Sequence, residues 1–190
     1  MQEVAGRRIA IVGAGDLARG IAQRARAFEI GTVAIARDAG KERAHNALFD
    51  AVRPVAELHA ALATADATVV TVPHTPETEG MIDRAAFAAM KRGSGFVNIA
   101  RGAVVDEDAL IEHLRGGHLG FAALDVAAVE PLAPDSPLWD MPNVLISPHS
   151  ASTVPSENGK ITEIFCWNLR CWLDGRIAEM RNTLDKNLMY

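Results

Sequence analysis

Three side chains that could bind an anion or transfer a proton follow apolar, strand-like runs of the sequence. Arg101 comes directly after "GFVNIA", Asp125 lies near the end of "GFAALDV", and His149 closely follows "NVLIS". A guanidinium binds a carboxylate through two parallel hydrogen bonds, and an imidazole titrates near neutral pH. Because ligands of an open parallel sheet gather at the carboxyl ends of its strands, we expect these residues to form a site. A charge after a buried strand is costly unless it meets an opposite charge, so Arg101 predicts an anionic substrate.

A glycine-rich turn, Gly13-x-Gly15-x-x-Ala18, joins the first apolar run to a helical pattern. A strand before it and a helix after it are the setting in which this weak motif indicates a dinucleotide site. Gly13 permits the tight turn, Gly15 lets the backbone approach a pyrophosphate, and the small Ala18 allows close helix–strand packing. Free N–H groups and the dipole at the helix N-terminus favour the anion. The alternative interpretation is a glycine turn that binds no ligand.

The residue after the second strand bears on the choice of coenzyme. NAD-binding sheets usually place an acid there, which holds the ribose 2′-hydroxyl. In this chain the strand ends "AIARDA", so Arg37 stands at that place and Asp38 follows it. A cation can pair with a 2′-phosphate, which favours NADP, whereas Asp38 keeps NAD open if the register shifts by one residue. The alternative is that Arg37 is an exposed, solvated side chain.

The hydrophobic pattern predicts alternating strands and helices. Strands are expected over residues 7–13, 32–36, 67–73, 95–100, 120–126 and 143–147, and helices over 16–28, 54–64, 84–90, 106–117 and 153–175. Strands that are apolar on both faces are typical of a parallel sheet covered by helices on both sides. We therefore expect an α/β fold with a Rossmann-type doubly wound parallel sheet. Residues 1–152 are expected to form a dinucleotide-binding domain, and 153–190 a C-terminal helix and tail.

The start of the helix predicted over 106–117 is acidic. Asp106, Glu107 and Asp108 are most simply interpreted as acids that favour a helix N-terminus. The proline-rich segment 127–142 is expected to be an ordered loop over the strand ends.

Composition excludes several classes of partner. The 190 residues carry a net charge of −5 with a pI near 5.7, and no basic patch indicates nucleic acid or a membrane surface. No apolar signal core or membrane-length run is present in the sequence. Cys166 and Cys171 lie five residues apart on a predicted helix and are interpreted as reduced thiols rather than a disulfide or metal site. We therefore expect a cytoplasmic protein without a metal site.

Residues 68–132, from "TVVTVPHTPETEG" to "ALDVAAVEPL", and 136–151, "SPLWDMPNVLISPHSA", resemble the D-isomer-specific 2-hydroxyacid dehydrogenases. That family includes glyoxylate/hydroxypyruvate reductases and phosphoglycerate dehydrogenases. The similarity extends from about residue 3 to about residue 185, and several separated motifs occur in the family's order.

The resemblance implies a role for each matching residue. Arg101 matches the arginine that binds the carboxylate and carbonyl of a 2-oxo acid, and Glu130, in "VEP", the acid that orients the catalytic histidine. His149 matches the acid/base that protonates the carbonyl oxygen, and Asp125 the carboxylate near the nicotinamide. Cofactor contacts are implied at Gly13, Gly15, Asp16, Leu17, Arg37, Val72, Pro73, Thr78, Ile99, Ala100, Arg101, Asp125, His149 and Ala151.

The chain departs from the family before its glycine loop. Members of the family have a long segment of substrate domain there, whereas Met1 lies only twelve residues before Gly13. Two explanations are open: a truncated product or excised cofactor domain of a longer enzyme, or a complete short protein. Family members usually pair through the cofactor domain, so the resemblance also implies a homodimer.

Two functions therefore compete. The first is hydride transfer between NADP(H), or alternatively NAD(H), and a small 2-oxo or 2-hydroxy acid. This reading includes the case in which the chain alone is inactive because it is truncated. The second is a dinucleotide-binding or sensing module without turnover, similar to transcriptional co-repressors that resemble this family.

Overall fold

The structure is a computed structural model that describes residues 3–40 and 47–186. The chain divides into two compact units, residues Met1–His149 and Ser150–Tyr190. In the described part of the chain, no helix is both long and apolar enough to cross a membrane.

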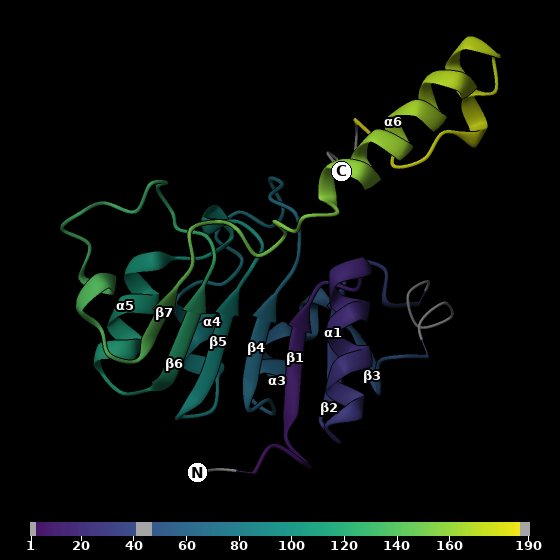
Figure 1. The fold of residues 1–190 in the computed structure, drawn as a ribbon. Helices are drawn as coiled ribbons and strands as arrows, with labels where there is room; N and C mark the ends of the chain where they lie inside the picture. The colour runs from purple at the N-terminus through teal and green to yellow at the C-terminus, as the bar shows by residue number, and fades with distance from the viewer. Residues whose placement is uncertain (1–2, 41–46, 187–190) are drawn as a thin grey trace. The chain divides into compact units, whose positions relative to one another are not determined.

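The first unit is built on a parallel sheet (Figure 1). The strands are β1 (Arg8–Val12), β2 (Gly31–Ala36), β3 (Ala51–Pro54), β4 (Ala67–Val70), β5 (Ser94–Asn98), β6 (Leu119–Leu124) and β7 (Val144–Ile146). Their order is β3-β2-β1-β4-β5-β6-β7, and every pairing is parallel. The chain runs outward from β1 to β3 and then crosses back to β4, so the strand order reverses between β1 and β4. In such sheets the ligand crevice lies at the carboxyl ends of the strands beside this reversal. The α/β fold and its parallel sheet are confirmed.

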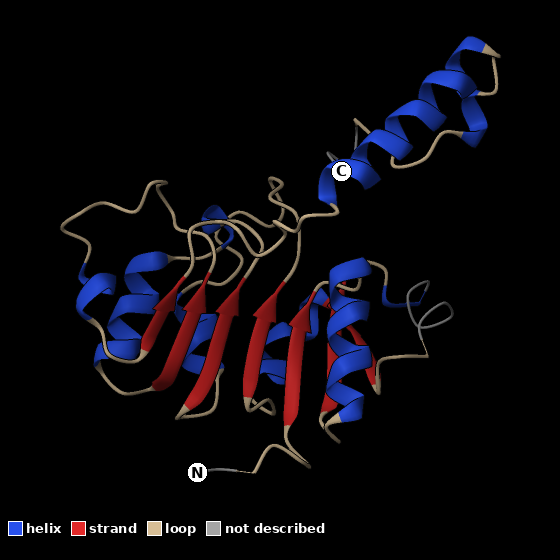
Figure 2. Cartoon of the chain, in the orientation of Figure 1, coloured by secondary structure: helices blue, strands red, loops and turns tan. Residues whose placement is uncertain are grey.

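Helices lie on both faces of the sheet (Figure 2). Buried side chains of the described residues form a hydrophobic core on each face. On one face α1 (Asp16–Ala27) packs its buried alanines against β1 and β2. On the other face lie α3 (Leu58–Leu62), α4 (Arg84–Ala89) and α5 (Glu107–Arg115), which bury the larger core around Phe87 and Phe96. Those two rings meet edge to face, with centroids 5.1 Å apart. Phe121 in β6 and Leu145 in β7 are 48% and 64% exposed.

Side-chain caps set where two of these helices begin. Asp83 accepts a hydrogen bond from the Ala86 N–H at 2.8 Å, and Asp106 accepts one from the Ala109 N–H at 2.9 Å. Each cap satisfies a backbone donor that has no partner inside the first turn of the helix. The interpretation of Asp106 as a helix N-terminal acid is confirmed.

One strand, β3, is not among those that the hydrophobic pattern predicts. β3 is a four-residue edge strand that contains Arg53 and ends at Pro54, a composition that edge strands tolerate and that resembles a loop. The helix predicted over 54–64 is consequently wrong at its start, because a 3-10 turn, Val55–Glu57, precedes α3.

The second unit contains α6 (Glu157–Leu173), which is shorter than the helix predicted over 153–175. The tail returns along this helix. The Trp167 indole N–H donates to the carbonyl of Glu179 at 2.9 Å, and the Asn168 amide exchanges two 2.8 Å hydrogen bonds with the backbone of Arg181. The Arg181 guanidinium lies 4.5 Å from the centroid of the Trp167 ring. These contacts explain how so short a unit folds back on itself.

The carboxylate of Asp66, just before β4, is expected to stabilise the fold at neutral pH and to lose this effect in acid. It accepts hydrogen bonds from the Arg8 N–H at 2.9 Å and the Lys91 ammonium at 3.0 Å. Burial raises the pKa of Asp66, but these hydrogen bonds and the charges of Lys91 and Arg7 together lower it below its ordinary value of 3.8. A lowered folded-state pKa gives stability that is present above the unfolded pKa and lost as pH falls through the folded one. Asp66→Asn should therefore reduce the free energy of unfolding at pH 7 by about 1 kcal/mol.

The acid dependence provides the control for this prediction. The difference between Asp66→Asn and the unchanged chain should shrink below about pH 4. Urea denaturation at pH 7 and pH 3 measures both values, and a constant difference at the two pH values would contradict the assignment.

Candidate functional site

The carboxyl ends of β5, β6 and β7 carry the residues singled out for chemistry. Asp125 directly follows β6, while Arg101 and His149 each come three residues after β5 and β7. Asp125, Glu130 and His149 line one cavity of about 450 Å³, together with the apolar side chains of Leu138 and Trp139. The parallel sheet therefore gathers at one edge residues that lie up to 48 positions apart in the sequence, from Arg101 to His149.

Glu130 and His149 form the central contact of the site. The Nδ1 of His149 lies 2.7 Å from Oε2 of Glu130, and Oε1 of Glu130 accepts the Ala127 N–H at 3.2 Å. The hydrogen bond with His149 is the largest influence on the pKa of Glu130 and lowers it. Partial burial opposes this, and the Ala127 N–H and the charges of His149 and Arg101 reinforce it. A carboxylate held on one ring nitrogen leaves the other nitrogen, Nε2, to exchange a proton with a ligand.

The backbone of His149 adopts an uncommon conformation that aims its ring. Its φ is +50°, in the left-handed region, and its N–H donates to the Ser147 carbonyl at 3.0 Å. Residues other than glycine seldom occupy this region, although histidine, asparagine and aspartate do so more readily than most. Such backbone conformations cluster at functional sites, where the surrounding structure holds them in place.

Asp125 is buried at the end of β6, with 7% of its surface exposed. The Ser147 hydroxyl donates to Oδ1 of Asp125 at 2.5 Å, which links the ends of β6 and β7. Ser147 is not among the residues predicted for the site. The sequence feature that could have indicated it is a hydroxyl residue between a strand and the "PH" dipeptide.

A buried asparagine shapes the turn that carries Arg101. Asn98 is 2% exposed; its Oδ1 accepts the Ala100 N–H at 3.0 Å, and its Nδ2 donates to the Arg101 carbonyl at 3.1 Å. The Arg101 guanidinium donates to the Ala100 carbonyl at 2.6 Å while the residue stays exposed. Asn98 is not among the residues predicted for the site. The sequence feature that could have indicated it is a single polar residue inside the apolar run "GFVNIA".

The glycine turn between β1 and α1 has the geometry that a phosphate needs. Gly13 has a φ of +119°, and a Cβ there would lie 2.5 Å from the Thr71 hydroxyl, so a side chain does not fit. Gly15 is exposed, has open space where a Cβ would stand, and caps α1 without a side-chain hydrogen bond. Exposed N–H groups at a helix start bind anions well. Asp16 adds a negative charge to this turn, and its ion pair with Arg19 offsets that charge.

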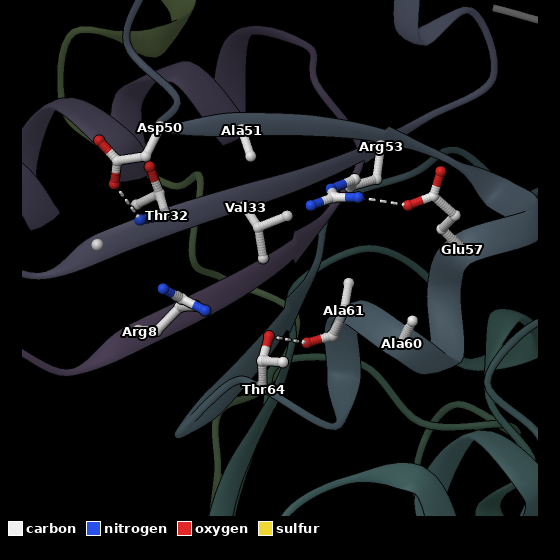
Figure 3. Close-up of a pocket in the computed structure, with 11 residues that line it drawn as sticks. Arg8, Thr32, Val33, Asp50, Ala51, Arg53, Glu57, Ala60, Ala61 and Thr64 are labelled. Atoms are coloured by element: carbon white, nitrogen blue, oxygen red, sulfur yellow. Dashed lines mark hydrogen bonds and ion pairs between the residues drawn. The ribbon is translucent and has the colours of Figure 1, made fainter.

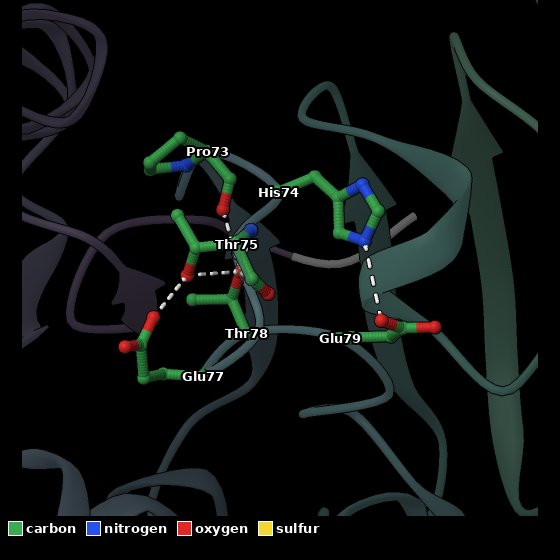
Figure 4. A network of polar contacts seen from close by, with 6 residues as sticks. All are labelled: Pro73, His74, Thr75, Glu77, Thr78 and Glu79. Carbon is green, nitrogen blue, oxygen red and sulfur yellow. Dashed lines mark hydrogen bonds and ion pairs between the residues drawn. The ribbon is translucent and has the colours of Figure 1, made fainter. Parts of the chain in front are cut away.

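The loop after β4 is fastened by its own hydroxyl groups (Figure 4). The Thr78 hydroxyl donates to the Pro73 carbonyl at 2.6 Å and accepts the Thr75 N–H at 2.8 Å. The Thr75 hydroxyl donates to Oε2 of Glu77 at 2.7 Å. Pro73 and Thr78, both predicted as cofactor contacts, thus belong to one rigid turn at the carboxyl edge of the sheet.

Arg37 and Asp38 are exposed directly after β2. The hydrogen bond from Thr75 lowers the pKa of Glu77 most, followed by its own backbone N–H; burial opposes them, and the positive charge of Arg37 lowers the pKa further. The charges of Arg37, after β2, and Glu77, after β4, therefore influence each other at the carboxyl edge of the sheet.

The remaining predicted contacts fall in two places. Leu17 is 59% exposed in the first turn of α1, and Val72, Ile99 and Ala100 lie after β4 and β5 at the carboxyl edge. Ala151 belongs to the second unit.

A second cavity, of about 440 Å³, lies between the starts of β1 and β2, strand β3 and helix α3 (Figure 3). Its charged groups are largely engaged within the protein. Arg53 pairs with Glu57 at 2.7 Å, and Asp50 accepts the Thr32 N–H at 2.7 Å. No residue predicted for the functional site lines this cavity, so we assign it no role.

Known proteins resemble this chain in both sequence and structure. The chain is 39% identical over 163 residues to D-3-phosphoglycerate dehydrogenase of Mycobacterium bovis, covering 85% of this chain and 30% of the relative. It is 38% identical over 174 residues to glyoxylate/hydroxypyruvate reductase B of Pectobacterium atrosepticum, covering 90% and 52%. The chain thus spans between about a third and about half of these curated relatives.

Solved structures agree with these sequence relatives. A D-isomer specific 2-hydroxyacid dehydrogenase from Xanthobacter autotrophicus Py2, solved in complex with NADPH and MES, superposes with a TM-score of 0.87 at 34% identity, covering 100% of this chain and 75% of that one. An NADPH-dependent glyoxylate/hydroxypyruvate reductase from Sinorhizobium meliloti, solved with NADP and sulfate, has a TM-score of 0.86 at 29% identity, covering 100% and 59%. The model of the family described as D-isomer specific 2-hydroxyacid dehydrogenase, NAD binding domain, matches residues 1–151. The chain therefore belongs to the D-isomer-specific 2-hydroxyacid dehydrogenase family.

Proposed function

We propose that this chain is the dinucleotide-binding part of an oxidoreductase that transfers hydride between a nicotinamide cofactor and a small 2-oxo or 2-hydroxy acid. The observation that carries the proposal is the 2.7 Å contact between Glu130 and His149, beside a cavity at the carboxyl edge of the sheet. Residues 1–152 form the binding domain in this proposal, and residues 153–190 its C-terminal helix and tail.

The residues at the carboxyl edge fit a dinucleotide. Gly13 and Gly15 leave room for a pyrophosphate at the start of α1. Arg37, directly after β2, would pair with the 2′-phosphate of the adenosine ribose. Asp125 and the backbone at Ile99 and Ala100 would hold the nicotinamide end, with Val72, Pro73 and Thr78 as further contacts. When bound, the cofactor supplies or accepts the hydride.

The protein's own part in the reaction is to hold the acid and to move a proton. Arg101 binds the substrate carboxylate through its guanidinium. His149 gives a proton from Nε2 to the carbonyl oxygen as that oxygen becomes a hydroxyl, and takes it back in the reverse direction. Glu130 keeps the imidazole oriented and stabilises its protonated form, since its lowered pKa keeps it anionic at neutral pH.

The preferred coenzyme in this proposal is NADP(H), because Arg37 offers a cation after β2. The first experiment is a fluorescence titration of the purified chain with NADPH and NADH. Saturable binding that favours NADPH supports the proposal, whereas failure of both to bind contradicts it.

Arg37→Asp should reverse this preference. The change removes the partner of the 2′-phosphate and places an acid where a ribose hydroxyl can bind, so the NADPH/NADH affinity ratio should fall at least tenfold. Arg92→Asp, an equal change of charge at another exposed arginine, controls for long-range electrostatics and should leave the ratio almost unchanged. An unaltered ratio in Arg37→Asp would overturn the NADP(H) assignment.

A second candidate function is a dinucleotide-binding or sensing module without turnover. The observation that favours it is that the Arg101 guanidinium donates to the Ala100 carbonyl at 2.6 Å and does not line the cavity beside Glu130 and His149. A fall in NADPH absorbance when the chain is mixed with NADPH and a panel of 2-oxo acids would demonstrate turnover and exclude this second function. We also propose that the chain acts as a homodimer formed through the binding domain, in the cytoplasm; light scattering tests the dimer.

A further inference from the structure

The three acids at the start of α5, Asp106, Glu107 and Asp108, lie in different surroundings. Asp106 caps the helix, and Asp108 is exposed. Glu107 instead reaches out of the helix, and its Oε2 accepts the Ala128 N–H at 2.9 Å. Ala128 belongs to the segment between β6 and Glu130, 21 residues further along the chain. The simplest interpretation of Glu107, as a helix N-terminal acid, therefore leaves this contact unexplained.

The same segment rests against the turn that carries Arg101. A Cβ at Gly102 would overlap the carbonyl group of Ala127 and would approach the N atom of Ala128 to 2.5 Å. Gly102 is buried, and its missing side chain lets the two backbones touch. The turn after β5 and the segment after β6 are thus in direct contact.

Two carboxylates hold two successive N–H groups of this segment. Oε1 of Glu130 accepts the N–H of Ala127, and Oε2 of Glu107 accepts that of Ala128. From Ala128 to Glu130 the segment is exposed, so burial does little to hold it. We propose that Glu107 is a positioning residue, which pins the segment 127–130 against the Gly102 turn so that Glu130 meets His149. Its value for catalysis rests on the function proposed above.

Two conservative substitutions distinguish the effect of the length of the Glu107 side chain from the effect of its charge. Glu107→Asp keeps an acid at the helix start but is one methylene shorter, so it no longer reaches the Ala128 N–H. Glu107→Gln loses the charge but keeps an oxygen acceptor at the same distance. His149→Ala serves as a reference, because it removes the main cause of the lowered pKa of Glu130.

The readout is the titration of the Glu130 carboxyl carbon by NMR in the full chain, with urea unfolding to confirm that each variant is folded. In Glu107→Asp the pKa of Glu130 should rise toward its ordinary value of 4.5, by at least half of the rise in His149→Ala. In Glu107→Gln it should stay near that of the unchanged chain.

The possible failures are distinct. If His149→Ala raises the pKa of Glu130 and Glu107→Asp does not, the positioning role is wrong while the proposed function stands. If Glu107→Gln raises the pKa of Glu130 as much as Glu107→Asp does, keeping an oxygen acceptor near the Ala128 N–H does not position Glu130, and the positioning role is again overturned. If His149→Ala has no effect, the Glu130–His149 contact is absent in solution, and both proposals fail.

Discussion

His149→Asn should slow reduction of a 2-oxo acid by roughly 10²- to 10⁴-fold, the usual contribution of a positioned acid or base. Asparagine is chosen because it tolerates the left-handed backbone at φ +50° that this position requires. Its amide cannot transfer a proton, so the carbonyl oxygen must take one from water. The measurement is single-turnover oxidation of NADPH, in whichever form of the protein turns over.

Dinucleotide binding is the control for this prediction. The glycine turn and the loop after β4 do not depend on the imidazole, so His149→Asn should still bind NADPH saturably. Glu130→Gln should give a smaller loss of rate, because it keeps a side chain next to Nδ1 but removes the negative charge. A full rate in His149→Asn would show that the proton comes from another group.

Gly102→Ala should have the largest effect on stability, lowering the free energy of unfolding by about 3 kcal/mol, at the upper end of what overpacking costs. The added methyl group would meet the backbone of Ala127 and Ala128, which cannot rotate away as a side chain can. If the two segments move apart instead, the contact between Glu130 and His149 should weaken as well. Urea denaturation measures the loss.

Gly20→Ala is the matched control in the same domain. Gly20 lies inside α1, and a Cβ there would meet only the flexible end of Arg24 at 3.5 Å. The same substitution should therefore stabilise the protein by about 0.5–1 kcal/mol, since alanine favours a helix. Equal effects at both positions would contradict the close contact at Gly102.

The parallel sheet was predictable because its strands are apolar on both faces, and β1, β4 and β5 carry that pattern almost without interruption. β3 was not, because an edge strand needs fewer apolar residues, and Arg53 and Pro54 resemble a loop in sequence. A sequence shows the hydrophobic pattern of each element, but not which short segments add to the edge of a sheet.

The candidate site shows the same limit. Residues at strand ends, such as Arg101 and His149, could be singled out because the end of each apolar run marks the end of a strand. Glu107 and Asn98 could not, because their significance lies in which distant or local backbone group each side chain reaches. One acid in a run of three looks like its neighbours until the partner across the loop is known.

The Glu130–His149 pair is short but open to water, with 40% and 45% of the two side chains exposed. In a high dielectric such a pair contributes less than about 1 kcal/mol. Covering it with protein would lower the local dielectric and strengthen the same contact several-fold without moving an atom. The strength of the Glu130–His149 pair therefore depends on the polarity of its surroundings. Added salt should weaken the exposed pair far more than a pair covered by protein.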